Sequence, residues 1–150
     1  MKTDSCAGQC TGQCAGEMAG VYFQDGFHCA EAVASAILES KGMDPTQAIM
    51  HATAFGGGMG RSFTETCGAI SGGLIAIGHL HGRTKRGESW DTPAAMGSQL
   101  RDRFIEGFGE TNCGVLRDRF GEEQNAECTK IVEIVTKATL EVLDSEPTAP

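Results

Sequence analysis

The sequence predicts an all-α protein, a compact bundle of five to seven helices of short to medium length in a single domain. Its length of 150 residues suits one domain with one core. Several segments repeat apolar residues at helical spacing, and no segment sustains the alternation typical of a half-buried strand. Capping residues and glycines mark helix ends at short intervals. Together these observations favour helices joined by short loops.

Each helix is predicted from its own pattern or boundary signal. Residues 17–25 form a short helix ended by a glycine, and the next helix repeats apolar residues along one face before a C-cap at Gly42. Asp44 and the proline after it open a third helix. After the glycine loop of residues 55–62, Thr66 is expected to cap a helix of small apolar residues. The predicted helices cover residues 17–25, 28–41, 45–54, 66–80, 91–107, 113–120 and 127–143.

The N-terminal segment carries a tetrapeptide repeat, CAGQ, CTGQ and CAGE, which spaces Cys6, Cys10 and Cys14 four residues apart. On a helix, this period would align the three thiols in a slanted stripe beside a stripe of glycines. Each glycine costs a helix about 0.5–1 kcal/mol, so the segment is expected to need a ligand or a docking surface to become ordered. We therefore predict a cysteine-rich arm at residues 1–16, a single helical domain at 17–145 and a disordered tail at 146–150.

The other cysteines of the chain are scattered, and each falls near the predicted start of a helix. A helix N-terminus favours thiolate over thiol, which lowers the pKa of a cysteine. The alternative is that these cysteines are buried, inert small hydrophobes. The placement near helix starts favours reactive thiolates over inert thiols. We therefore predict that the scattered cysteines are metal ligands, with the three cysteines of the repeat as further candidates. The scattered cysteines are Cys29, Cys67, Cys113 and Cys128.

Glycines surround these cysteines and are candidates for contacting a cofactor. Gly58 and Gly60 in the glycine loop could present N–H groups to anionic sulfur. Gly68 lies in a helix that alanine would make more stable, so close approach of a backbone or a ligand is expected there. The alternative is a tight turn and close helix packing without a ligand. The loop fits neither a dinucleotide fingerprint nor a P-loop.

Four segments of the chain, taken together, resemble the family of putative redox-active proteins named for its C…GCAxxG…C…C cysteine pattern. This domain also occurs in split-Soret cytochromes c. The resemblance implies a mainly helical redox domain whose four scattered cysteines meet at a redox or metal centre, an iron–sulfur cluster being the expected cofactor. The haem-attachment motif CxxCH is absent, so covalent haem is not expected. The matching segments are GFHCAEAV, FGGGMGRSFTETCGAISGGL, FGETNCGVL and ECTKIVEIVTKA.

Three functions remain open from the sequence. The first is a small redox protein that binds an iron–sulfur or related thiolate-metal centre and transfers electrons. The seven cysteines fall one short of two all-cysteine cubane clusters. The three cysteines of the repeat are therefore expected to borrow another ligand such as His28 or His51, to join a shared larger cluster or to pair across a dimer. The second function is metal-free thiol–disulfide chemistry, as an enzyme or a sensor. The third is zinc or metal storage.

Composition limits the partners. The net charge of −8 disfavours nucleic acid and anionic membranes. The N-terminus has no apolar segment typical of a secretory signal, so a soluble, cytoplasmic protein is expected. A redox partner protein of unknown identity and a homodimer are predicted. Hydrolytic motifs are missing, so an electron-transfer or redox protein is favoured over a hydrolase or transferase.

Overall fold

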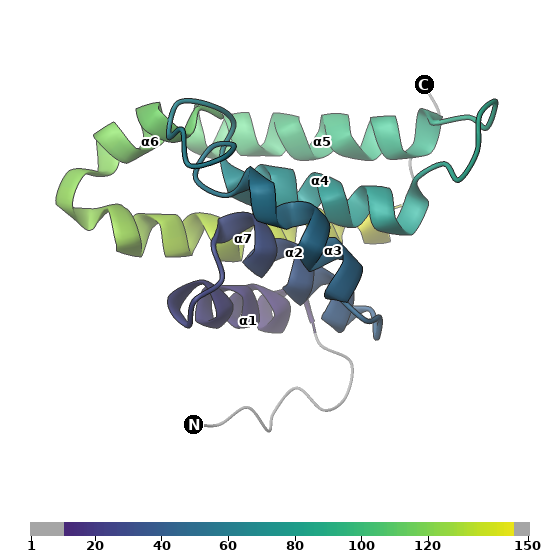
Figure 1. Ribbon diagram of the computed structural model, residues 1–150, viewed down its shortest axis with the longest axis horizontal. Helices are drawn as coiled ribbons and strands as arrows, with labels where there is room; N and C mark the ends of the chain where they lie inside the picture. The colour runs from purple at the N-terminus through teal and green to yellow at the C-terminus, as the bar shows by residue number, and fades with distance from the viewer. Residues whose placement is uncertain (1–10, 146–150) are drawn as a thin grey trace.

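The structure is a computed structural model that describes residues 11–145, and it confirms the all-α class (Figure 1). No strand occurs in this range; an isolated antiparallel bridge joins Thr66 to Asn112. Two 3₁₀ turns, η1 (Thr53–Phe55) and η2 (Gly121–Glu123), extend α3 and lead into α7. The α-helices are α1 (Gly12–Gln24), α2 (Cys29–Ser40), α3 (Thr46–Ala52), α4 (Gly68–His81), α5 (Asp91–Phe108), α6 (Cys113–Phe120) and α7 (Gln124–Asp144).

Helix α7 is the centre of the bundle and packs against α1, α2, α4 and α5. Its buried face carries Val132, Val135 and Leu140, at the spacing expected for an amphipathic helix. Helix α2 is buried along most of its length, and four of its twelve residues are alanine. Because small side chains allow helix backbones to approach closely, α4 lies directly against α2 (Figure 1).

The start of α1 corrects the predicted boundary between arm and domain. Helix α1 begins at Gly12, so the third unit of the cysteine repeat belongs to the bundle rather than to a separate arm. Its glycines allow it to dock on α7: a Cβ on Gly16 would lie 2.9 Å from the backbone oxygen of Glu133, and one on Gly20 would collide with the Glu133 side chain. For the third unit of the repeat, the docking surface is therefore α7. Cys6, Cys10 and the predicted tail lie outside the described residues.

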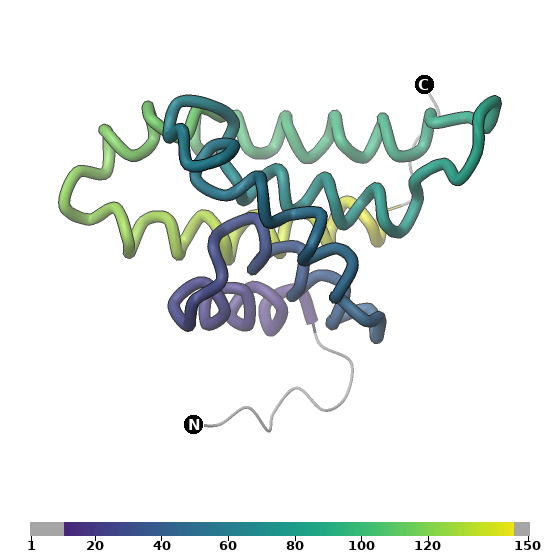
Figure 2. The backbone as a smooth tube through the Cα atoms, in the orientation of Figure 1, coloured from purple at the N-terminus to yellow at the C-terminus, as the bar shows by residue number. Residues whose placement is uncertain are grey.

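The glycine loop before α4 has an unusual backbone. Residues 57–61 have five consecutive positive φ angles, between +60° and +66°, and this run includes Met59 and Arg61 as well as glycines. It forms a left-handed turn, which only glycine adopts without steric cost. The turn is closed by hydrogen bonds from the N–H of Gly60 to the oxygen of Ala54, at 2.8 Å, and from Phe63 to Gly57, at 2.9 Å. Figure 2 shows the loop curled beside the start of α6.

Thr66 does not cap α4 as predicted. It pairs with Asn112 in the bridge, and Cys67 takes the N-cap position. The backbone N–H of Cys67 donates to the oxygen of Thr111 at 2.7 Å, and that of Cys113 donates to the oxygen of Glu65 at 2.7 Å. These two hydrogen bonds join the chain just before α4 to the chain just before α6, a pairing that local sequence patterns do not encode.

Candidate functional site

Four free cysteines line one cavity of about 650 Å³. Cys29 is the first residue of α2, Cys113 is the first residue of α6, Cys67 directly precedes α4, and Cys128 lies early in α7. The structure thus brings together the scattered cysteines that the sequence singled out. Each comes from a different helix, which is why no pair of them is close in sequence.

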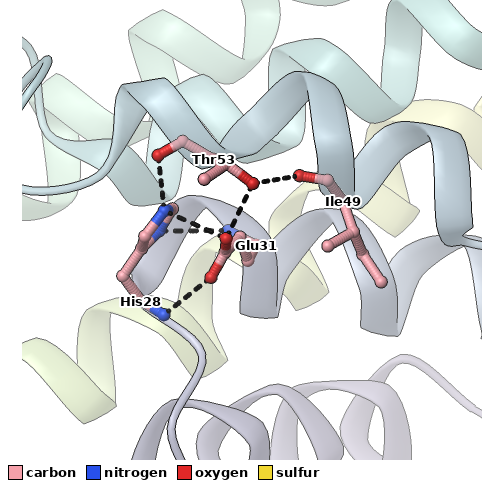
Figure 3. Close-up of polar contacts among 4 residues, drawn as sticks. All are labelled: His28, Glu31, Ile49 and Thr53. Atoms are coloured by element: carbon pink, nitrogen blue, oxygen red, sulfur yellow. Dashed lines mark hydrogen bonds and ion pairs between the residues drawn. The ribbon is translucent and has the colours of Figure 1, made fainter.

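His28 directly precedes Cys29 and holds the first turn of α2 through its polar contacts (Figure 3). His28 is the N-cap: its Nδ1 accepts a hydrogen bond from the backbone N–H of Glu31 at 3.4 Å, and the Glu31 carboxylate accepts one from the backbone N–H of His28 at 3.2 Å. The Nε2 atom lies 2.8 Å from the backbone oxygen of Thr53. Since that oxygen only accepts, Nε2 carries the hydrogen. The imidazole therefore ties the start of α2 to the end of α3.

The Asn112 side chain fixes Cys113 in a similar way. Its Oδ1 accepts a hydrogen bond from the backbone N–H of Val115 at 3.1 Å, which caps α6. Its Nδ2 donates to the backbone oxygen of Thr64 at 2.6 Å. The same side chain therefore starts α6 and holds the segment that leads to Cys67.

Two of the three predicted cofactor-binding glycines make room for cysteine side chains. A Cβ on Gly58 would lie 2.7 Å from the Cβ of Cys113, and a Cβ on Gly68 would collide with the Sγ of Cys29. Gly60 lines the cavity itself. Gly72, one turn after Gly68, would carry its Cβ into the backbone oxygen of Ala30. These glycines let α4 and the loop approach the cysteine-bearing ends of α2 and α6 closely.

Burial shifts the pKa of three of these cysteines in the opposite direction from the one predicted. It raises the pKa of Cys67 to about 12 and that of Cys128 to about 11, and it also raises the pKa of Cys113. Negative charge on Cys29 contributes in each case, so the thiols are close enough to repel one another when ionised. The helix N-termini were expected to lower these pKa values. Loss of solvation and repulsion between the thiolates raise the pKa values by more than the helix ends lower them.

Of the other predicted ligands within residues 11–145, His28 lines the cavity, whereas Cys14 and His51 do not. Cys14 lies in α1, about 13 Å along the helix from the cavity-lining Phe23, and it is not one of the free cysteines. His51 is exposed on α3, whereas His28 does line the cavity. Among the residues that the structure describes, no group of three or more His, Cys, Asp or Glu side chains is placed to hold a metal ion.

Two arginines that the sequence did not single out, Arg61 and Arg117, line the cavity. Arg117 lines it one turn after Cys113, with its guanidinium carbon 3.7 Å from the ring centroid of Phe63. The Arg117 charge lowers the pKa of Cys113 and Cys128, in opposition to burial. The spacing of four residues between Cys113 and Arg117 on a helix was the available signal.

The fold and the cavity define a small all-α protein built around a cluster of free thiols. The chain belongs to the family described as putative redox-active protein (C_GCAxxG_C_C), whose sequence model matches residues 27–142. In this chain the central motif reads Cys-Gly-Ala-x-x-Gly from Cys67 to Gly72. Neither the curated proteins nor the solved structures gave a significant match. Within residues 11–145, no helix has the length and apolar character needed to cross a membrane.

Proposed function

We propose that this redox-active protein holds an iron–sulfur cluster in the four-thiol cavity and transfers electrons to a partner protein. The observation that carries the proposal is that four free cysteines from four helices line a single cavity. Four cysteines are the ligand set of the common iron–sulfur clusters, and such a cluster supplies one-electron chemistry when bound. The proposed ligands are Cys29, Cys67, Cys113 and Cys128.

The surroundings of the thiols suit such a group. A single tetrahedral ion would draw four sulfurs to about 3.8 Å from one another, given metal–sulfur bonds of about 2.3 Å. A cluster of several irons and sulfides separates its cysteine ligands more widely, which suits thiols distributed around a cavity. Gly58 and Gly68 keep the Cys113 and Cys29 side chains free of steric contact on one side.

The raised pKa values make loading of the cluster pH-dependent. The thiols must lose their protons to bind iron, and burial opposes this loss in the metal-free protein. Bound metal would lower the pKa of the thiols again, because its positive charge stabilises the thiolates that coordinate it. Assembly is therefore expected to release protons and to be faster at pH 8 than at pH 6.

The test is iron and sulfide quantification on protein purified without oxygen, combined with electron paramagnetic resonance. Stoichiometric iron and sulfide are expected in the wild type, and a large loss in Cys29→Ala. Cys6→Ala is the matched comparison, because it removes a thiol of the N-terminal repeat and is expected to keep the four-thiol cavity loaded. Absence of iron and sulfide after anaerobic reconstitution would refute the proposal.

A second candidate is metal-free thiol–disulfide chemistry, and the environment of Cys29 favours it. The adjacent Cys29 side chain raises the pKa of His28, so an imidazole lies beside this thiol. A base beside a cysteine is the arrangement that activates it as a nucleophile. In this reaction, two thiols of the cavity would form a disulfide and pass two electrons and two protons to an oxidised partner disulfide. Mass spectrometry of metal-free protein after mild oxidation should then show a loss of two hydrogens between cavity cysteines. An unchanged thiol count would exclude this function.

We also propose that the cavity is shielded by a protein partner or by a second copy of the chain. Met59 and Phe63 of the glycine loop are 43% and 40% exposed, and Phe63 lines the cavity. An apolar rim of this kind suits docking of another protein. Size-exclusion chromatography with light scattering distinguishes the two, since only self-association gives a dimer mass.

A further inference from the structure

Besides its four thiols, the cavity is lined by two positively charged side chains. Arg61 and Arg117 both line it, although the chain as a whole carries a net charge of −8. Within the described part of the chain, neither guanidinium takes part in an ion pair. Two arginines without carboxylate partners at one cavity of an acidic protein are unexpected from composition alone.

Arg117 is held in place at this cavity. Its guanidinium stacks on the ring of Phe63 with 3.7 Å between the guanidinium carbon and the ring centroid, which is close for a cation–π contact. Phe63 has a φ of +56°, so the loop backbone adopts a sterically costly conformation to present this ring. Arg117 is half-buried, and its charge reaches the thiols of Cys113 and Cys128.

The nearby carboxylates are engaged elsewhere. Glu31, which also lines the cavity, accepts hydrogen bonds from Thr53 and His28. Glu127, which lies near Cys128, forms an ion pair with Lys130 at 2.7 Å. Neither of these carboxylates pairs with Arg61 or Arg117, so both guanidinium groups remain available to a ligand.

The rest of the lining suits an organic molecule. Phe23 and Ile131 provide apolar wall, and Gln124 provides an amide. The volume of about 650 Å³ lies within the range of small-molecule sites, about 300–1,000 Å³. A guanidinium beside an apolar wall matches a carboxylate, phosphate or sulfonate attached to a hydrocarbon or aromatic group.

We infer that the arginine side of the cavity is a binding subsite for a small organic anion, which Arg117 and Arg61 hold beside Cys113 and Cys128. The guanidinium groups alone recognise the anion, so the subsite does not depend on the iron–sulfur proposal. In the metal-free protein it gives small anionic molecules preferential access to the thiols.

The experiment compares two aromatic disulfides that modify thiols, anionic dithiobis-nitrobenzoate and neutral dithiodipyridine. Full-length, reduced, chelator-treated protein is reacted with each at low ionic strength, and modification of Cys113 and Cys128 is followed by peptide mass spectrometry. The ratio of the two rates reports preference for an anion, because the thiol pKa affects both reagents. Arg117→Gln is expected to lower the ratio roughly threefold or more, and Arg117→Lys to retain most of it.

Arg119→Gln is the matched control. It removes the same charge from the same helix, but Arg119 does not line the cavity and instead donates to the backbone oxygen of Phe108 at 2.6 Å. Its ratio is expected to stay near that of the wild type. Benzoate should also protect the two cysteines from the neutral reagent in the wild type and not in Arg117→Gln. Equal ratios in Arg117→Gln and Arg119→Gln, or no protection by benzoate in the wild type, would overturn the inference, whatever the metal content.

Discussion

The left-handed glycine loop offers a paired test of how the cavity is built. Gly58 and Gly60 have nearly the same backbone conformation, with φ of +66° and +60°. Their surroundings differ. A Cβ on Gly58 would lie 2.7 Å from the Cβ of Cys113 and 3.0 Å from the backbone oxygen of Glu65, whereas a Cβ on Gly60 would meet nothing within 4 Å. Gly58→Ala and Gly60→Ala therefore share the conformational cost and differ in the steric one.

The expected magnitudes follow from these two costs. An alanine in the left-handed region costs about 1 kcal/mol, and this is the whole expected effect of Gly60→Ala. Forcing a Cβ into a packed site adds about 1–3 kcal/mol, so Gly58→Ala should lose about 2–4 kcal/mol of unfolding free energy. For a chain of this size, 1 kcal/mol corresponds to about 2–4 °C in Tm.

The assay is chemical and thermal unfolding of chelator-treated protein, followed by circular dichroism. Metal must be absent because any ligand of the folded state would mask the difference. Gly60→Ala should lower Tm by about 2–4 °C and Gly58→Ala by about 5–15 °C. Equal losses for the two variants would refute the reasoning, since they would mean that Gly58 is required for its φ angle alone and not for the approach of Cys113.

Three further predictions concern the ends of α2 and α4. Gly72→Ala should destabilise the protein by about 2–4 kcal/mol because its Cβ would collide with the Ala30 backbone, whereas Gly78→Ala, in open space on the same helix, should stabilise it by about 0.5–1 kcal/mol. His28→Ala should cost about 1–2 kcal/mol by removing the N-cap of α2, and His28→Asn should recover part of this. Above pH 9 the metal-free protein should lose stability with a contribution from Cys67 of up to about 1.4 kcal/mol per pH unit, because its folded pKa of about 12 exceeds the ordinary value of 9.0.

Each of these predictions has its own decisive comparison. A stabilised Gly72→Ala would show that α2 and α4 are not in close contact there. If His28→Asn and His28→Ala had the same free energy of unfolding in urea, the loss of stability in His28→Ala would not come from the missing N-cap. For the pH effect, Cys67→Ala provides the reference: the Cys67 contribution is fully present below pH 9 and lost toward pH 12, so only the wild type should show it. Parallel stability curves for the two proteins would contradict the raised pKa.

The helices could be predicted because their signals are local. The apolar spacing in α2 and α7 depends only on neighbours within a turn or two. The predicted start of α4 was wrong because its decisive contact is not local: Thr66 pairs with Asn112, which is far away in sequence. The predicted start of α1 was wrong for a similar reason, since glycines that weaken an isolated helix also allow close docking on α7.

The sequence by itself determined that this chain is helical and that its scattered cysteines lie near helix starts, because both follow from short-range backbone preferences. Only the tertiary structure decided that Cys29, Cys67, Cys113 and Cys128 share one cavity, that glycines make room for them, and that Arg117 and Phe63 stand beside them. It also reversed the expected direction of the thiol pKa values. Solvation depends on which atoms surround a group in space, and that arrangement arises only when the helices pack.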